Sequence, residues 1–156
     1  MSILHLVPVV SSTITLWLAV DQYLFLGIFL NKKVEPNTKD VLTPYWNRMI
    51  DTVVPVIIAP LLVTMASTAT ILATSSEELL RDKGSFSWYI ASTALAASHF
   101  AFVPIIMPKI RGLQNGGLTP ELRRWMRVHI IRSFTVDLFC WVTCIVASTK
   151  TLSARV

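Results

Sequence analysis

The stretch TVVPVIIAPLLVTMASTATILAT, residues 52–74, decides the fold class of this chain. It contains no Asp, Glu, Lys or Arg. A helix needs roughly 20 residues, at a rise of about 1.5 Å each, to cross the hydrocarbon core of a bilayer. Residues 52–74 therefore predict a membrane-spanning helix.

Three further stretches support the same prediction, at about 7–30, 86–108 and 128–149. Hydrophobic residues make up 53% of the 156 residues, and the mean hydropathy of +0.59 is too high for a soluble domain of this size. No internal repeat or linker divides the chain. We therefore expect an all-α, multi-pass integral membrane protein, with one transmembrane domain over residues 1–156 folded as a four-helix bundle.

The basic residues are distributed unevenly among the connections between these spans. Nine belong to the first and third connections: Lys32, Lys33, Lys39, Arg48, Lys109, Arg111, Arg123, Arg124 and Arg127. Four lie in the second connection or after the last span: Arg81, Lys83, Lys150 and Arg155. The positive-inside rule then predicts that both termini are non-cytosolic. Topology and anionic lipid account for the net charge of +5, so no nucleic-acid partner is expected.

The fourth helix has a strong start signal in LTPELRR, residues 118–124. Thr119 is the predicted N-cap, Pro120 suits the first helical position, and Glu121 places a negative charge in the first turn. The helix should therefore begin near residue 120, outside the membrane, and continue to about residue 149.

Five ionisable residues interrupt the predicted spans. Counting about 1.5 Å per residue from the basic side places Asp21, His99 and Asp137 at one depth, roughly 14 Å into the bilayer. His129 and Arg132 come out shallower, on the path to that level. Because an ionisable side chain in hydrocarbon is costly, each should face the bundle interior and find a partner there.

These residues admit two interpretations. The first is an internal ion-pair and hydrogen-bond cluster that only orients the helices. The second is a site, because acid, base and cation gathered in one cavity are the usual components of one. Within the second interpretation a metal such as iron, manganese or copper is an open alternative, with the candidate ligands His99, His129, Asp21 and Asp137.

Aromatic residues accompany the ionisable ones toward the basic side. Trp125, His129 and Arg132 are spaced four and three residues apart, so they share one stripe of the fourth helix. Tyr45 and Trp46 fall just before the second span, beside the expected entrance. Trp125, Trp46 and Tyr45 are therefore candidates for substrate binding, although anchoring in the membrane interface is the simpler role for each.

The segment VPIIMPKIRGLQNGGLTPELRRWMRVHIIRSF, residues 103–134, resembles the anthrone oxygenase-like family of small four-span integral membrane proteins. That family joins a proline-containing end of its third helix to a Leu, Trp, His and Arg signature entering the last helix. The matching residues here are Pro108, Leu122, Trp125, His129 and Arg132. Where the family commonly has an asparagine after the proline, this chain has Lys109 and Ile110.

The resemblance implies a membrane-bound tailoring enzyme of secondary metabolism, which oxidises a hydrophobic, aromatic polyketide-type substrate with O2 in a pocket between the helices. It implies that His129 is the base and Arg132 stabilises the anion. Asp21, His99 and Asp137 then orient these groups or supply an alternative base. O2 is a co-substrate in this interpretation, and whether a cofactor such as a metal is also used stays open.

Two other functions remain open at this point. A non-oxidative membrane cyclase or isomerase of a biosynthetic intermediate would use the same acid–base residues without O2. A non-catalytic membrane binding protein or helper subunit would use none of them chemically. The feature that discriminates is whether the polar residues border an accessible cavity. A homo-oligomer is compatible with so small a bundle, and a eukaryotic host would place it in the endoplasmic reticulum membrane.

Overall fold

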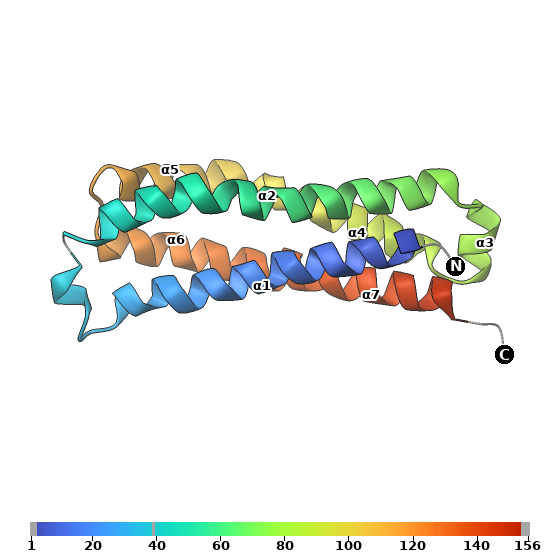
Figure 1. Cartoon of the computed structure of the whole chain (residues 1–156), viewed down its shortest axis with the longest axis horizontal. Coiled ribbons are helices and arrows are strands. Elements are labelled where there is room, and N and C mark those ends of the chain that lie inside the picture. Colours follow the sequence, from blue (N-terminus) through green and yellow to red (C-terminus); the bar gives the residue numbers. More distant parts are fainter. Residues whose placement is uncertain (1–2, 39, 154–156) are drawn as a thin grey trace.

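The computed structural model describes residues 3–38 and 40–153, which form a bundle of long helices running up and down (Figure 1). Four helical spans are long and apolar enough to cross a membrane: Ile3–Leu30, Leu42–Thr74, Phe86–Gln114 and Thr119–Leu152. The described residues contain no strand, so the all-α prediction is confirmed for them. Lys39 and Arg155, both counted in the charge asymmetry, lie outside the described residues.

The first span joins a short 3-10 helix η1 (Ile3–Leu6), the helix α1 (Val7–Gly27) and a final 3-10 turn η2 (Ile28–Leu30). A single turn, η3 (Glu35–Asn37), lies in the connection to the second span. The second span is one unbroken helix, α2 (Leu42–Thr74).

The helix α2 begins at Leu42, before the predicted second span at 52–74, which it contains. The sequence Leu42-Thr43-Pro44 repeats Leu118-Thr119-Pro120, and both triplets lie at the start of a helix, since α2 begins at Leu42 and α6 at Thr119. Pro44 is tolerated there because the first-turn N–H groups have no partner inside the helix. Tyr45 and Trp46 therefore lie in the first turns of α2, not in a loop.

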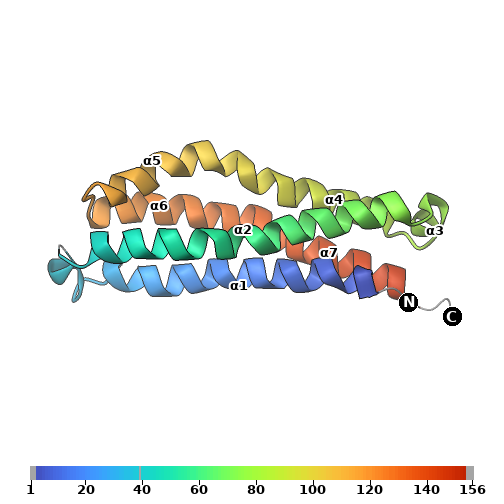
Figure 2. The same cartoon turned by 45° about the horizontal axis from the view of Figure 1, so that its top comes forward.

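The third span changes helix type in the middle. Its elements are α4 (Phe86–Ser98), the 3-10 turn η4 (His99–Phe102) and α5 (Val103–Gln114), after a short helix α3 (Glu77–Asp82) in the preceding connection. Pro104 lacks an N–H and crowds the carbonyl four residues earlier, which disfavours a continuous α-helix there. The span bows outward between α4 and α5 (Figure 2).

The fourth span contains α6 (Thr119–Arg132), a π-helical turn η5 (Ser133–Asp137) and α7 (Leu138–Leu152). Its start agrees with the prediction near residue 120, but Thr119 is not the N-cap. Leu118 takes that position without a side-chain cap, and Thr119 Oγ1 instead donates to Glu35 Oε1 at 2.7 Å. The threonine thus fixes the first connection to the fourth span.

A glycine turn sets the close approach of α5 and α6. Gly116 has a φ of +88°, in the left-handed region that favours glycine. A Cβ on Gly117 would meet the carbonyl oxygen of Gly112 at 2.5 Å, so only glycine fits there without movement. The two helices that flank this turn carry much of the buried core.

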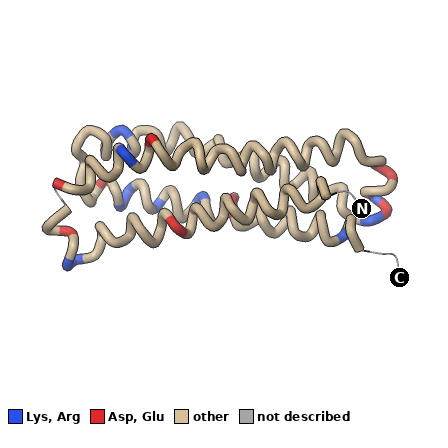
Figure 3. Tube along the Cα trace, viewed as in Figure 1, with Lys and Arg blue, Asp and Glu red and all other residues tan. Residues whose placement is uncertain are grey.

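The exposed surface along the middle of the bundle is largely apolar. Trp17 and Phe134, for example, each expose 64% of their surface. Charged residues gather at the two ends of the bundle, with a few along the middle (Figure 3). This distribution is the one expected where hydrocarbon, and not water, surrounds the middle of the helices.

Candidate functional site

Four ionisable side chains join into one buried hydrogen-bonded series, which we call the polar chain: His99, Asp137, Arg132 and His129. His99 Nδ1 lies 3.0 Å from Asp137 Oδ1, and Arg132 Nε donates to Asp137 Oδ2 at 3.4 Å. Arg132 Nη2 lies 3.2 Å from His129 Nδ1, and His129 Nε2 lies 2.9 Å from the carbonyl oxygen of Ala19. The polar chain therefore ties the third span to the fourth and the fourth to α1.

The partners of the two histidines decide which ring nitrogens carry protons. Arginine only donates and a carbonyl oxygen only accepts. His129 Nδ1 must therefore accept from Arg132, and His129 Nε2–H must donate to Ala19. His99 Nδ1–H donates to the Asp137 carboxylate, while His99 Nε2 has no hydrogen bond with any described residue. In this assignment His129 is neutral, and the Arg132 guanidinium and the Asp137 carboxylate form an ion pair.

The π-helical turn explains how Arg132 reaches Asp137. In an α-helix, residues five positions apart lie on different faces, so Asp137 would point away from Arg132. The wider turn η5 brings residues five apart into line, and Asp137 can then accept from Arg132 as well as from His99. Ser133 Oγ and Thr135 Oγ1 donate to carbonyls four residues earlier, a contact that often bends helices.

The polar chain is almost completely buried. His129 exposes 1% of its surface and Asp137 exposes 3%, while His99 and Arg132 each expose 8%. Desolvating such a pair is expensive unless every charge is paired and hydrogen bonded. Here the carboxylate accepts two hydrogen bonds and the guanidinium donates two, which makes this burial tolerable.

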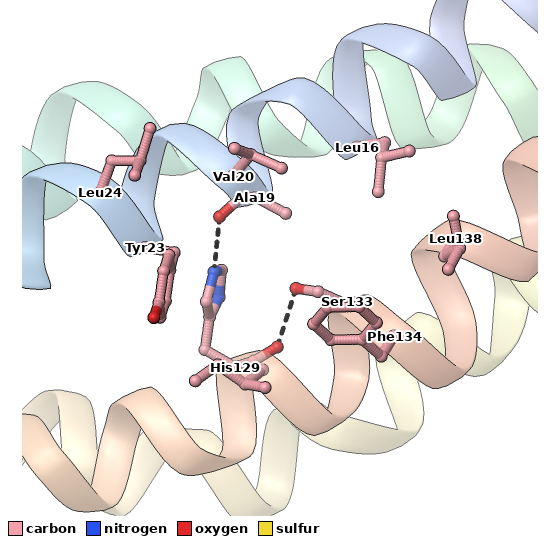
Figure 4. Close-up of a pocket in the computed structure, with 10 residues that line it drawn as sticks. Leu16, Ala19, Val20, Tyr23, Leu24, His129, Ser133, Phe134 and Leu138 are labelled. Carbon is pink, nitrogen blue, oxygen red and sulfur yellow. Dashed lines mark hydrogen bonds between the residues drawn. The ribbon is translucent and has the colours of Figure 1, made fainter.

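A groove of about 510 Å³ lies between α1 and the α6–η5 segment, and His129 forms part of its wall (Figure 4). Its lining is mainly aliphatic and aromatic, and it includes Tyr23, Ser133 and Phe134. We call it the α1–α6 groove. Volumes of roughly 300–1,000 Å³ accommodate drug-sized ligands. One end of the polar chain therefore borders a cavity of ligand size.

A second gap of about 10 Å³ lies beside Asp137, inside the bundle. Its polar lining residues are Ser12, Thr15, Thr64 and Asp137. This volume is close to the minimum for one water molecule, and four polar groups are enough to bind it. The carboxylate end of the polar chain thus borders a space of water size, whereas the His129 end borders the α1–α6 groove.

Asp21 does not join the polar chain, which corrects its predicted position. It forms no hydrogen bond or ion pair with the described residues, while its neighbour Gln22 is buried, with 8% exposure. Counting residues gave the height of Asp21 on the helix but not the face, and one residue turns a helix by about 100°.

No group of three or more His, Cys, Asp and Glu among the described residues is placed to hold a metal ion. The four predicted metal candidates therefore do not converge.

None of the three predicted aromatic residues lines the α1–α6 groove. Trp125 stacks on the His129 ring at 4.7 Å between centroids and 13° between planes, and Trp46 meets Trp125 edge-on at 5.2 Å. Both tryptophans are buried, and their indole N–H groups have no partner among the described residues. Tyr45 is 40% exposed and packs against Phe29. Trp46 is therefore a core residue, and not the interfacial anchor that the sequence suggested.

Tyr23 and Ser133 line the α1–α6 groove but were not predicted as site residues from the sequence. Tyr23 follows Ala19 and Leu16 on one stripe of α1, at spacings of four and three, and all three line the α1–α6 groove. Ser133 follows His129 by four on the facing helix. The helical spacing around His129 was the available signal for Ser133, but nothing in the sequence says that α1 is its neighbour.

Three curated proteins resemble this chain over nearly their whole length. They are an epoxidase, pydX, of an Acremonium species, an epoxidase, gkaX, of Penicillium citrinum, and a probable epoxidase, scpX, of Mollisia scopiformis. Each is 24% identical over 156 or 157 residues, covering 96% of this chain and 94%, 95% and 96% of the three relatives. No protein-family model matches the chain, and no solved structure matches it.

Proposed function

We propose that this chain is a membrane-embedded, anthrone oxygenase-like oxidoreductase of secondary metabolism that transfers one oxygen atom from O2 to a hydrophobic small molecule. Two of the three similar proteins are named epoxidase and the third probable epoxidase, which supports an oxidative enzyme. The observation that carries the proposal is the buried polar chain with one end at the α1–α6 groove. Acid, base and cation gathered beside a cavity of ligand size are the usual components of a catalytic site, which favours catalysis over orientation alone.

We propose further that the four spans insert in a bilayer with both termini on the non-cytosolic side. The exposed apolar middle of the helices and the excess of basic residues at the opposite end support this arrangement. In a eukaryotic host the membrane would be that of the endoplasmic reticulum.

Two oxygenations fit the same site. Conversion of an anthrone CH2 to a ketone sends one atom of O2 to the product and one to water, with the two hydrogens also going to that water, so no outside reductant is needed. Epoxidation adds one oxygen atom to a C=C bond and makes water from the other, using two protons and two electrons. A reduced nicotinamide or a phenolic ring of the substrate can supply those electrons. Both reactions profit from stabilising a substrate oxyanion, which makes the substrate electron-rich toward O2.

The hydrogen bonds of the polar chain suggest the role of each residue. His129 holds its proton on Nε2, so it is suited to donating to a substrate oxyanion once Ala19 is released. This differs from the predicted role of His129 as the base. Arg132 supplies positive charge behind the ring, and Asp137, which also accepts from His99, holds that charge in place.

The test is O2 uptake by the purified protein in lipid nanodiscs, given either a hydroxylated anthrone or a lipophilic phenolic alkene with a reduced nicotinamide as the electron donor, with 18O2 and mass analysis of the product. The proposal expects one labelled oxygen atom in the product, with loss of two hydrogens from the anthrone or none from the alkene. Folded protein that consumes no O2 with either substrate contradicts it. Rearranged product without added oxygen would instead identify a cyclase or isomerase that uses the same polar chain.

A further inference from the structure

The α1–α6 groove opens through the apolar side of the bundle, and not at its basic end, where the entrance was expected. Tyr23 is 50% exposed and Phe134 is 64% exposed at its borders. Both lie within spans that are long and apolar enough to cross a membrane. The mouth of the groove therefore faces the acyl chains of the proposed bilayer, where a hydrophobic molecule is most concentrated.

Polar atoms are concentrated in one part of this otherwise apolar lining. Tyr23 Oη forms no hydrogen bond with any described residue, and Ser133 Oγ, which donates to the carbonyl of His129 at 2.8 Å, keeps its accepting lone pairs. Tyr23 extends from α1 beside the His129 ring, and Ser133 lies on the other side of that ring (Figure 4). A hydroxyl without a partner is unfavourable in hydrocarbon, and an acyl chain has no atom to satisfy it.

We propose that the α1–α6 groove is the substrate site, entered sideways from the lipid. Its occupant is an apolar, ring-bearing molecule with one hydroxyl or carbonyl oxygen, which Tyr23 and Ser133 bind beside His129. The apolar lining receives the ring system, and the three polar residues receive the oxygen on which the proposed chemistry depends. This inference rests on the proposed function for the identity of the occupant, but binding itself requires no turnover.

Photolabelling under anaerobic conditions separates binding from oxidation. The probe is a hydroxylated anthrone bearing a diazirine, added to the protein in nanodiscs and mapped by peptide mass spectrometry. The expected result is saturable labelling of residues 16–24 and 130–138, which unlabelled hydroxyanthrone prevents. Unsaturable labelling over all apolar surfaces, as an acyl-chain site would give, overturns the inference. Labelling around Tyr45 at the basic end also overturns the inference. So does an absence of groove labelling because a second copy of the chain covers the groove.

Matched valine variants on α1 test the location. Val20 lines the groove and is 41% exposed, whereas Val10 is 58% exposed on the same helix and lines neither cavity. Val20→Trp should fill the groove and weaken competition by hydroxyanthrone at least tenfold, while Val10→Trp should leave it unchanged. Equal effects of the two variants, in protein with unaltered thermal unfolding, contradict the assignment.

Tyr23→Phe tests the polar contact without changing the shape of the groove. Loss of one hydrogen bond should weaken binding of hydroxyanthrone roughly three- to tenfold, and it should not change binding of anthracene, which has no oxygen. An equal effect on both ligands would show that Tyr23 acts only through packing. If labelling follows these expectations but no O2 is consumed, the site stands and the oxygenase proposal fails.

Discussion

The two halves of this bundle bury large apolar and small hydroxyl side chains in different proportions. Toward the basic end, large residues fill the interior, and we call this the apolar half: Leu26, Leu42, Trp46, Ile106, Leu113, Leu122, Trp125 and Met126. Toward the termini, small hydroxyl residues are buried, and we call this the hydroxyl half: Ser11, Ser12, Thr15, Thr64, Ser67, Thr68, Ser92, Thr143 and Ser148.

Contacts between helices differ accordingly. In the hydroxyl half, hydroxyl pairs join neighbouring spans, as in Ser11 with Thr64 at 2.7 Å and Thr93 with Thr68 at 2.8 Å. In the apolar half, aromatic and aliphatic side chains interlock. The polar chain lies where the two halves meet, with Trp125 packed against His129 on one side and the small gap beside Asp137 on the other. The candidate site is therefore held by side-chain packing on the side of the apolar half, and it borders hydroxyl groups on the side of the hydroxyl half.

Removing the Asp137 carboxylate, which lies where the two halves meet, should lower the free energy of unfolding most. Asp137→Ala leaves Arg132 buried without its carboxylate, so the free energy of unfolding should fall by about 3–5 kcal/mol. Replacing both partners, with Arg132→Met and Asp137→Leu, should recover most of that loss. Unfolding by sodium dodecyl sulfate in mixed micelles measures both. A double variant as unstable as the single one would show that the pair is not the cause.

Trp46→Ala tests the packing of the apolar half. The side chain is fully buried and contacts Trp125, so a large cavity should form and the free energy of unfolding should fall by about 3 kcal/mol. Trp46→Phe should recover part of the loss by filling some of the space. The same detergent titration applies, and a loss below about 1 kcal/mol would mean that this half is loosely packed.

Thr64→Val tests the hydroxyl half with a nearly isosteric change. Thr64 is 1% exposed and pairs with Ser11, yet hydrogen bonds between membrane helices average only about 0.6 kcal/mol. Stability should therefore change much less than for Trp46→Ala. A loss as large as that of the tryptophan variant would remove the distinction between the two halves.

The smallest change in stability should come from a substitution of Glu35, which lies outside the spans. Hydrogen bonds from Thr119 and then Arg123 hold the pKa of this carboxyl below its ordinary 4.5. A lowered folded-state pKa stabilises the protein above pH 4.5, and that contribution is lost as pH falls through the lowered value. Glu35→Gln should therefore lower the thermal midpoint slightly at pH 6 and leave it unchanged at lower pH. A variant difference that grows toward acid pH contradicts this linkage.

Much of the bundle could be predicted from the sequence because span length and composition are local properties. The absence of charge in residues 52–74 and the start signal before Pro120 each depend on a few neighbouring residues. The helical part of the first connection was not predicted because Pro44 was not matched to Pro120.

The candidate site was less accessible to prediction because its geometry depends on helix rotation and on a π-helical turn. Counting residues along each helix placed His99 and Asp137 at one depth, and these two side chains do form a hydrogen bond. The same count also placed Asp21 at that depth, but Asp21 lies on another face of its helix. No proline or glycine in residues 133–137 marks the turn that aligns Arg132 with Asp137. The α1–α6 groove depends on which helices are neighbours, which the sequence does not state.

The most direct test of the central claim, that the polar chain is the catalytic centre, is the rate of O2-dependent product formation by Asp137→Asn in nanodiscs. Asparagine keeps the shape of the side chain but removes the charge between His99 and Arg132. We expect the rate to fall by about a hundredfold or more, with anaerobic photolabelling of the groove preserved. A folded variant that keeps the wild-type rate would show that the polar chain only orients the helices.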